Sequence, residues 1–125
     1  MSNTDVMPTL LDLVGVGVPA NVQGHNHAPV LRGDAMKIED EVFSSGWYVG
    51  VTRLRHMSLH SNTFRITWWP GQEDGELYDL CIDPHEFENL FHRDEHRAWR
   101  ETLMARLLRA NAQAGPIDPD IICDW

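Results

Sequence analysis

The sequence predicts an α+β fold in which a small antiparallel β-sheet is packed by a C-terminal amphipathic helix and preceded by a separate short helix. Residues 63–69 alternate apolar and polar side chains, and turn residues at 70–75 join them to a second apolar run at 76–80, which is typical of a hairpin. Residues 94–112 and, over a shorter stretch, residues 5–15 repeat apolar positions at helical spacing.

The first helix is predicted in the stretch "DVMPTLLDLVG". Asp5 is a candidate cap, Pro8 suits an early turn, and Gly15 is a plausible end. Its apolar stripe consists of Leu10, Leu11 and Val14. A helix this short needs a partner surface to be stable in water.

The middle of the chain is predicted to change from irregular to extended structure. Residues 16–34 hold three glycines and two prolines, which favours an irregular connection, and the acidic residues 35–46 are expected to be exposed. From Val42 onward β-forming residues dominate and indicate two strands, divided near Gly46 or Gly50.

The last helix is predicted to begin with Asp94 as its cap and to end at Gly115 and Pro116. Its buried face is expected to consist of Trp99, Leu103 and Leu107, flanked by Met104 and Leu108. Before it, the Asp83-Pro84 step indicates a tight turn.

The composition and net charge of the sequence limit the classes of molecule that the chain is expected to bind. A chain of 125 residues is long enough for one core, and 42% apolar and 23% charged residues are ordinary for a globular protein. A net charge of −9 repels phosphate backbones and anionic lipid, so nucleic acids and membranes are not expected partners. The sequence contains neither a membrane-spanning apolar run nor a secretory signal pattern at its N-terminus.

Seven histidines raise the question of a metal site. His25 and His27 are two residues apart, so on an extended segment their imidazoles share a face and can approach one metal ion. Two further pairs have a spacing of four: His56 with His60, and His92 with His96. Structural zinc usually needs four ligands, and no further ligands are indicated. A small histidine-based metal-binding protein stays open as an alternative.

No catalytic centre is recognisable from local motifs. The acidic residues at 73–76 lie in a predicted turn, where solvation is expected. Cys81 and Cys123 fit no Cys-x-x-Cys pattern, which leaves one disulfide or two thiols open, and nothing near Cys81 marks it as an activated nucleophile. The sequence also lacks Gly-x-Ser-x-Gly and a phosphate-binding glycine loop.

Two blocks, "DVMPTLLDLVG" and "ELYDLCIDPHEFENL", nevertheless make the chain resemble the C-terminal end of the sulfatases. In that family a D-x-x-P-T-L-L-D-L-x-G helix leads into a G-x-x-x-x-P-x-L-x-G segment, and E-L-Y-D-L-x-x-D-P-x-E-x-x-N-L closes the C-terminal subdomain. The matching residues are Asp5, Pro8, Thr9, Leu10, Leu11, Asp12, Leu13 and Gly15, then Glu76, Leu77, Tyr78, Asp79, Leu80, Asp83, Pro84, Glu86, Asn89 and Leu90. Residues 35–62 match only loosely.

The resemblance implies a sulfuric ester hydrolase of the alkaline-phosphatase-like superfamily, which uses a formylglycine and a calcium ion. Formylglycine is made from the Cys or Ser of a Cys/Ser-x-Pro/Ala-x-Arg motif, and this sequence has none. The Asp-Asp, Asp-Asn and Asp-His dipeptides of the family's metal site are absent from it too. The resemblance therefore implies a C-terminal fragment with no catalytic residue, metal ligand or cofactor of its own, inactive when alone.

The resemblance also implies how the chain is divided and what it contacts. The expected parts are residues 1–34 (last helix and connection of the large domain), 35–114 (C-terminal subdomain) and 115–125 (tail). The Leu10, Leu11 and Val14 face is expected to pack on the missing catalytic domain or to self-associate, and a stand-alone module that pairs with a separate catalytic domain is the alternative. Because this subdomain borders the active-site cleft in sulfatases, the residues expected to contact substrate are His25, His27, Trp68 and Trp69.

Overall fold

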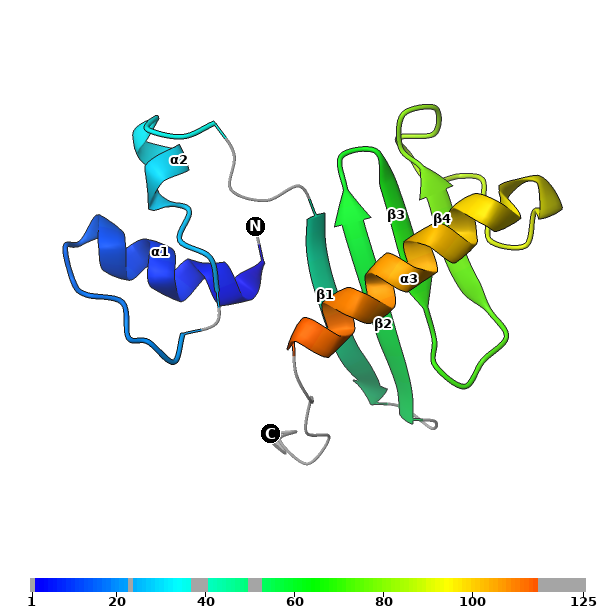
Figure 1. Cartoon of the computed structure of the whole chain (residues 1–125), viewed down its shortest axis with the longest axis horizontal. Helices are drawn as coiled ribbons and strands as arrows, with labels where there is room; N and C mark the ends of the chain where they lie inside the picture. The colour runs from blue at the N-terminus through cyan, green and yellow to red at the C-terminus, as the bar shows by residue number, and fades with distance from the viewer. Residues whose placement is uncertain (1, 23, 37–40, 50–52, 115–125) are drawn as a thin grey trace. The chain divides into compact units, whose positions relative to one another are not determined.

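The computed structural model divides between Val42 and Phe43 into two compact units, which we call the N-terminal unit and the sheet unit. The residues that it describes are 2–22, 24–36, 41–49 and 53–114. The elements, shown in Figure 1, are η1 (Asn3–Asp5), α1 (Val6–Leu13), α2 (Ala28–Arg32), β1 (Glu41–Val49), β2 (Arg53–Ser61), β3 (Phe64–Trp68), β4 (Gly75–Asp79), η2 (Asp94–His96) and α3 (Arg97–Ala114).

The sheet unit is built on a four-stranded sheet in the order β1-β2-β3-β4. The strands β2, β3 and β4 pair antiparallel, with Leu59 opposite Ile66 and Ile66 opposite Leu77. The hairpin predicted from the alternation at 63–69 and the apolar run at 76–80 is therefore confirmed as β3 and β4. The predicted α+β class, a sheet with a C-terminal helix, is confirmed with it.

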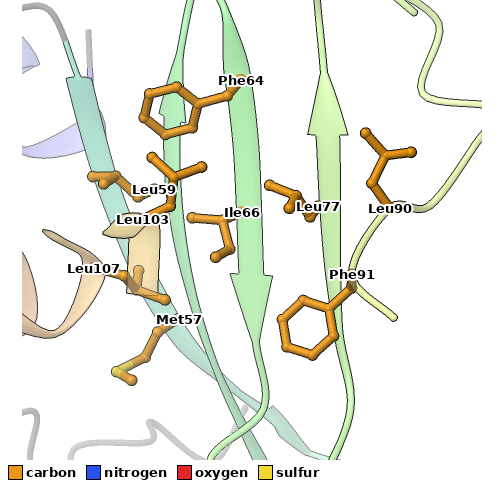
Figure 2. Close-up of a cluster of buried hydrophobic side chains, with 9 residues drawn as sticks. All are labelled: Met57, Leu59, Phe64, Ile66, Leu77, Leu90, Phe91, Leu103 and Leu107. Carbon is orange, nitrogen blue, oxygen red and sulfur yellow. The ribbon is translucent and has the colours of Figure 1, made fainter. Parts of the chain in front are cut away.

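The hydrophobic core lies between one face of the sheet and α3, which crosses that face (Figure 1). Because side chains alternate across a strand, every second residue of β2, β3 and β4 reaches this layer. The core residues, drawn in Figure 2, are Met57, Leu59, Phe64, Ile66, Leu77, Leu90, Phe91, Leu103 and Leu107. All of them belong to the sheet unit, so this unit carries its own core.

The predicted buried face of the last helix is confirmed. Leu103 and Leu107 are at most 1% exposed, and Trp99 and Met104 pack against the core from partly buried positions. Leu108 points away and is 44% exposed. A spacing of four residues places Leu103 and Leu107 on one side of the helix, which is why the sequence pattern identified them.

The joint after β4 is fixed by the side-chain amide of Asn89. Its Oδ1 accepts hydrogen bonds from the backbone N–H groups of Leu77 and Phe91, both at 3.0 Å. Its Nδ2 donates to the carbonyl of Gly75 at 3.0 Å, and the N–H of Leu90 donates to the carbonyl of Leu77 at 2.8 Å. Asn89 and Leu90 therefore form hydrogen bonds with the backbone groups of Gly75 and Leu77 at the outer edge of β4, as a neighbouring strand would.

The turn predicted at the Asp83-Pro84 step is also present. The carbonyl of Asp83 accepts from the N–H of Glu86 at 3.2 Å, and its Oδ2 accepts from the N–H of Glu88 at 2.8 Å. Glu86 has a left-handed backbone, with φ of 58°, and its carboxylate pairs with Arg65 at 2.8 Å. The joint is thus tied to β3 by an ion pair as well as to β4 by backbone hydrogen bonds.

The two strands predicted from Val42 onward are confirmed as β1 and β2, whereas Gly46 as their point of division and Asp94 as a helix cap were wrong. The strands are not divided at Gly46, because β1 runs through it; a β-carbon there would press on the ring of His56, so the strand needs a glycine for close approach rather than for a turn. Gly50 lies outside the described residues. Asp94 is not the cap of the last helix but the first residue of η2. The N-cap of η2 is Arg93, whose side chain forms no capping hydrogen bond.

The connection predicted to be irregular contains α2. Pro29 lies in its first turn, where backbone N–H groups have no partner within the helix, so the N–H that proline lacks costs no hydrogen bond. Gly33 ends the helix in the left-handed conformation, with φ of 83°. The segment expected to be exposed up to residue 46 already enters β1 at Glu41. Gly15, with φ of 75°, follows α1 as predicted, whereas Gly115 and Pro116 lie outside the described residues.

Candidate functional site

Asp5 is the centre of a buried polar cluster in the N-terminal unit. Its side chain is 2% exposed, and its Oδ2 accepts a hydrogen bond from the backbone N–H of Ser2. Its Oδ1 accepts from the backbone N–H of His25 at 2.9 Å. A residue that closes the turn of η1 is therefore also bonded to a segment twenty positions along the chain.

Thr9 extends this cluster along α1. Its hydroxyl donates to the carbonyl of Asp5 at 2.6 Å and accepts from the backbone N–H of His27 at 3.0 Å. Both Asp5 and Thr9 are buried, at 1% and 3% exposed. Because buried polar groups are stable only when they are hydrogen-bonded, these bonds fix the path of the connection over η1 and α1.

A second polar contact lies further along α1. Asp12 accepts hydrogen bonds from the side chains of Asn26 and Arg32, the latter with both nitrogens at 3.0 Å from Oδ1. The bond from Asn26, and then that from Arg32, hold the pKa of Asp12 below its ordinary value. Asn26 also accepts from the N–H of Ala28 at 2.8 Å, which starts α2.

The charge state of Asp5 follows from these partners. Burial alone raises the pKa of a carboxyl group, but the N–H bonds from Ser2 and His25 and the nearby imidazoles of His27 and His25 outweigh it. The pKa of Asp5 is therefore lowered, and the ionised carboxylate is the form that the cluster stabilises.

His25 and His27 turn out to face differently. The Nδ1 of His25 lies 3.9 Å from Asp5 Oδ1, but its side chain is 61% exposed. The Nε2 of His27 lies 3.3 Å from Asp5 Oδ2, its side chain is 12% exposed, and no described residue forms a hydrogen bond with that nitrogen. Of the two, His25 offers its imidazole to solvent, whereas His27 turns toward the carboxylate.

Trp68 and Trp69 lie at the end of β3 in the sheet unit. Trp68 is the last residue of the strand and packs against the core. Trp69 follows it at the start of the turn, where its carbonyl accepts from the N–H of Gln72 at 3.0 Å. The four residues expected to contact substrate thus come from two units, a pair from each.

The other candidates for chemistry were the remaining histidines, the acidic residues and the cysteines. Within the described ranges, no three His, Cys, Asp or Glu side chains are arranged to hold a metal ion. His92 pairs with Asp74 at 2.8 Å on the surface, and His96 lies 3.7 Å from Glu95. Cys81 is exposed in the turn after β4, and Cys123 lies outside the described residues.

The apolar stripe of α1 is largely uncovered. Leu10 is 55% exposed and Val14 71%, whereas Leu11 is half-buried. Other exposed apolar residues of the same segment are Val6, Met7, Leu13, Val16 and Val18. The buried positions of the N-terminal unit are small or polar, in contrast to the leucine-rich core of the sheet unit. Among the described helices, none is long and apolar enough to cross a membrane.

Asp5 and Thr9 are the structurally important residues that the sequence indicated only weakly. Asp5 is predicted as a local cap, and nothing in the adjacent residues points to a partner at His25. The sequence feature that points to both residues is the D-x-x-P-T block, which contains them.

The helix-covered sheet, the joint closed by Asn89 and the helix that carries the Pro-Thr-Leu-Leu segment occur in a chain whose family match defines the class of protein: a C-terminal sulfatase domain. The chain belongs to the family described as N-sulphoglucosamine sulphohydrolase, C-terminal, whose model matches residues 1–113.

Individual relatives agree with this family. The chain is 29% identical over 124 residues to an N-acetylglucosamine-6-O-sulfatase of Bacteroides thetaiotaomicron, covering 94% of this chain and 22% of that protein. It is 37% identical over 89 residues to a Delta 4,5-hexuronate-2-O-sulfatase of the same organism, covering 69% of this chain and 18% of that protein. The chain therefore spans about a fifth of the length of the curated relatives that it matches.

A solved structure shares the fold over nearly the whole chain. It is a protein in complex with its substrate D-glucosamine-2-N,6-O-disulfate, and it matches with a TM-score of 0.76 and 27% sequence identity. The match covers 94% of this chain and 25% of that one.

Proposed function

We propose that this chain is the C-terminal part of a sulfatase-type hydrolase, that it hydrolyses no sulfate ester alone, and that it acts together with a catalytic domain. The observation that carries the proposal is the pairing of a family match over residues 1–113 with a sequence that has no Cys/Ser-x-Pro/Ala-x-Arg motif. The formylglycine and calcium chemistry of sulfatases is then supplied by residues outside this chain. The domain division 1–34, 35–114 and 115–125 belongs to this proposal.

Sulfated sugars are the substrate class of the complete enzyme under this proposal. The names of two relatives, an N-acetylglucosamine-6-O-sulfatase and a hexuronate-2-O-sulfatase, support it, and so does the sulfated glucosamine bound in a similar structure. An exposed imidazole donates hydrogen bonds to sulfate oxygens, and an indole ring packs on the apolar face of a sugar. His25 is the better candidate for binding sulfate because its side chain is exposed. Trp69 is the better candidate for packing on a sugar because it lies outside the core. His27 faces the carboxylate of Asp5, and Trp68 packs against the core.

The partner surface in this proposal is the apolar face of α1, made of Leu10, Leu11 and Val14. An uncovered apolar helix face favours association, because burying it removes apolar area from water. The catalytic domain is the proposed occupant, since relatives that contain this segment are about four times as long as the chain. Self-association through the same face is the alternative occupant.

Purification of the chain from its source cells with an antibody, followed by peptide mass spectrometry, tests this proposal. We expect a formylglycine-containing peptide from a Cys/Ser-x-Pro/Ala-x-Arg motif, either in one heavier polypeptide or in a second one that co-purifies. Recovery of the chain alone, as monomer or as self-assembled oligomer and without such a peptide, would contradict the proposal. An unrelated antibody provides the control for peptides that bind the resin.

A further inference from the structure

The end of the connection between α1 and α2 is held against η1 and α1 by polar bonds. We call residues 24–28 the strap. The N–H of His25 is bonded to Asp5 Oδ1, and the N–H of His27 is bonded to the hydroxyl of Thr9. The strap also runs very close to η1, because a β-carbon on Gly24 would overlap the carbonyl of Thr4. It is thus seated in one position, and Asp5 lies beneath it.

We propose that the strap is an acid-sensitive device locked by Asp5: it is closed over η1 and α1 while the Asp5 carboxylate is ionised, and it opens when that carboxylate takes up a proton.

The chemistry of the carboxylate explains why protonation opens the strap. Both oxygens of Asp5 accept backbone N–H groups, Oδ1 from His25 and Oδ2 from Ser2. An ionised carboxylate is an acceptor at both oxygens, whereas a protonated one has to donate from one of them. The oxygen that carries the proton no longer accepts a hydrogen bond from the backbone N–H that faces it. That N–H is then left without a partner, which costs free energy.

The charged groups around Asp5 act in the same direction. From the strap, the imidazoles of His25 and His27 approach its two oxygens at 3.9 and 3.3 Å, and an imidazole that carries a proton on both nitrogens favours the carboxylate. From α1, the neutral hydroxyl of Thr9 donates to the backbone carbonyl of Asp5. Among the described residues, Asp12 and Arg32 form an ion pair with each other, and Asp12 also accepts a hydrogen bond from Asn26.

The direction of the pH effect follows from the lowered pKa of Asp5. A carboxyl whose pKa is lower in the folded state stabilises that state above the unfolded value, about 3.9 for aspartate, and this stabilisation is lost as the pH falls through the folded value. The strap is therefore expected to be closed at neutral pH and to open only in acid, as the pH falls through the lowered pKa of Asp5.

Nitrogen-15 NMR spectra of the full 125-residue chain, recorded from pH 7 into acid, test the proposal. We expect the His25 and His27 amide signals to shift together in acid, with loss of their protection from hydrogen exchange, while the amides of β3 and β4 stay in place. Asp5→Asn removes the charge at nearly constant size and is expected to give the open-strap signals already at pH 7. Asp34→Asn, an exposed carboxylate of the same unit, is the matched control and is expected to behave as the unchanged chain.

Each other outcome would overturn the proposal. These outcomes are acid-independent His25 and His27 amides, an Asp5→Asn chain with closed-strap signals, a strap that is already unprotected at pH 7, or opening that coincides with unfolding of the sheet unit. The pH series on the unchanged chain keeps the test decisive even where Asp5→Asn fails to fold. Because the readout is the strap itself, the result does not depend on sulfatase activity.

Discussion

Replacing Leu107 with alanine is expected to lower the free energy of unfolding of the chain by about 3 kcal/mol. Leu107 is 0% exposed and lies in the core cluster between α3 and the sheet. Truncating it removes buried methyl groups and leaves a cavity that the strands, held by their backbone pairing, cannot fill by moving. Urea unfolding followed by tryptophan fluorescence measures the change, because Trp68 and Trp99 pack on this core.

The neighbouring leucine provides the matched control. Leu108 has the same chemistry and the same helix propensity, but it is 44% exposed. Leu108→Ala is expected to cost well under half as much as Leu107→Ala, since little area returns to water. Equal losses at the two positions would show that α3 is not oriented on the sheet as described.

Replacing Gly75 with alanine is expected to destabilise the sheet unit by about 2 kcal/mol. An added β-carbon would overlap the ring of Phe91, which is buried in the core at 7% exposed. The ring has to move, and its neighbours Leu90 and Asn89 are bonded to β4 and resist that movement. The same urea experiment gives the magnitude.

A double-mutant cycle separates this overlap from a general effect of the substitution. Phe91→Leu removes the ring that Gly75→Ala would meet. Adding Gly75→Ala to the Phe91→Leu chain should therefore cost less than adding it to the unchanged chain. Additive losses would contradict the contact between Gly75 and Phe91.

The features that the sequence predicted are those with a regular local pattern. Phe64, Ile66 and Trp68 alternate with polar residues, and this alternation identified β3 and the face that it buries. Leu103 and Leu107 are four residues apart and marked the buried side of α3 in the same way. Here local periodicity and tertiary burial agree, because these positions all face the one core between α3 and the sheet.

The features that the sequence missed depend on contacts between distant residues. α2 has five residues, too few to show a helical period, although Pro29 and Gly33 carried its start and stop signals. Gly46 suggested a turn, but the ring of His56 on the next strand explains that glycine. The role of Asp5 depends on a backbone N–H twenty residues away, which no local window contains.

The candidate site was predictable only in part, for the same physical reason. The histidine pair was visible as a spacing of two, and that spacing led to the expectation of a shared face. The structure instead directs His27 toward the buried Asp5 and leaves His25 exposed. The difference in burial involves Asp5, which is distant in the sequence, so the spacing of the two histidines does not reveal it.

Hydrolysis of an aryl sulfate by the purified chain, in the presence of calcium, tests whether the chain has sulfatase activity of its own. We propose that the chemistry of the family lies outside these 125 residues, so we expect no turnover above a buffer blank, while an intact arylsulfatase in the same buffer serves as the positive control. Turnover that rises in proportion to the concentration of the chain, and that persists after repurification, would contradict the account.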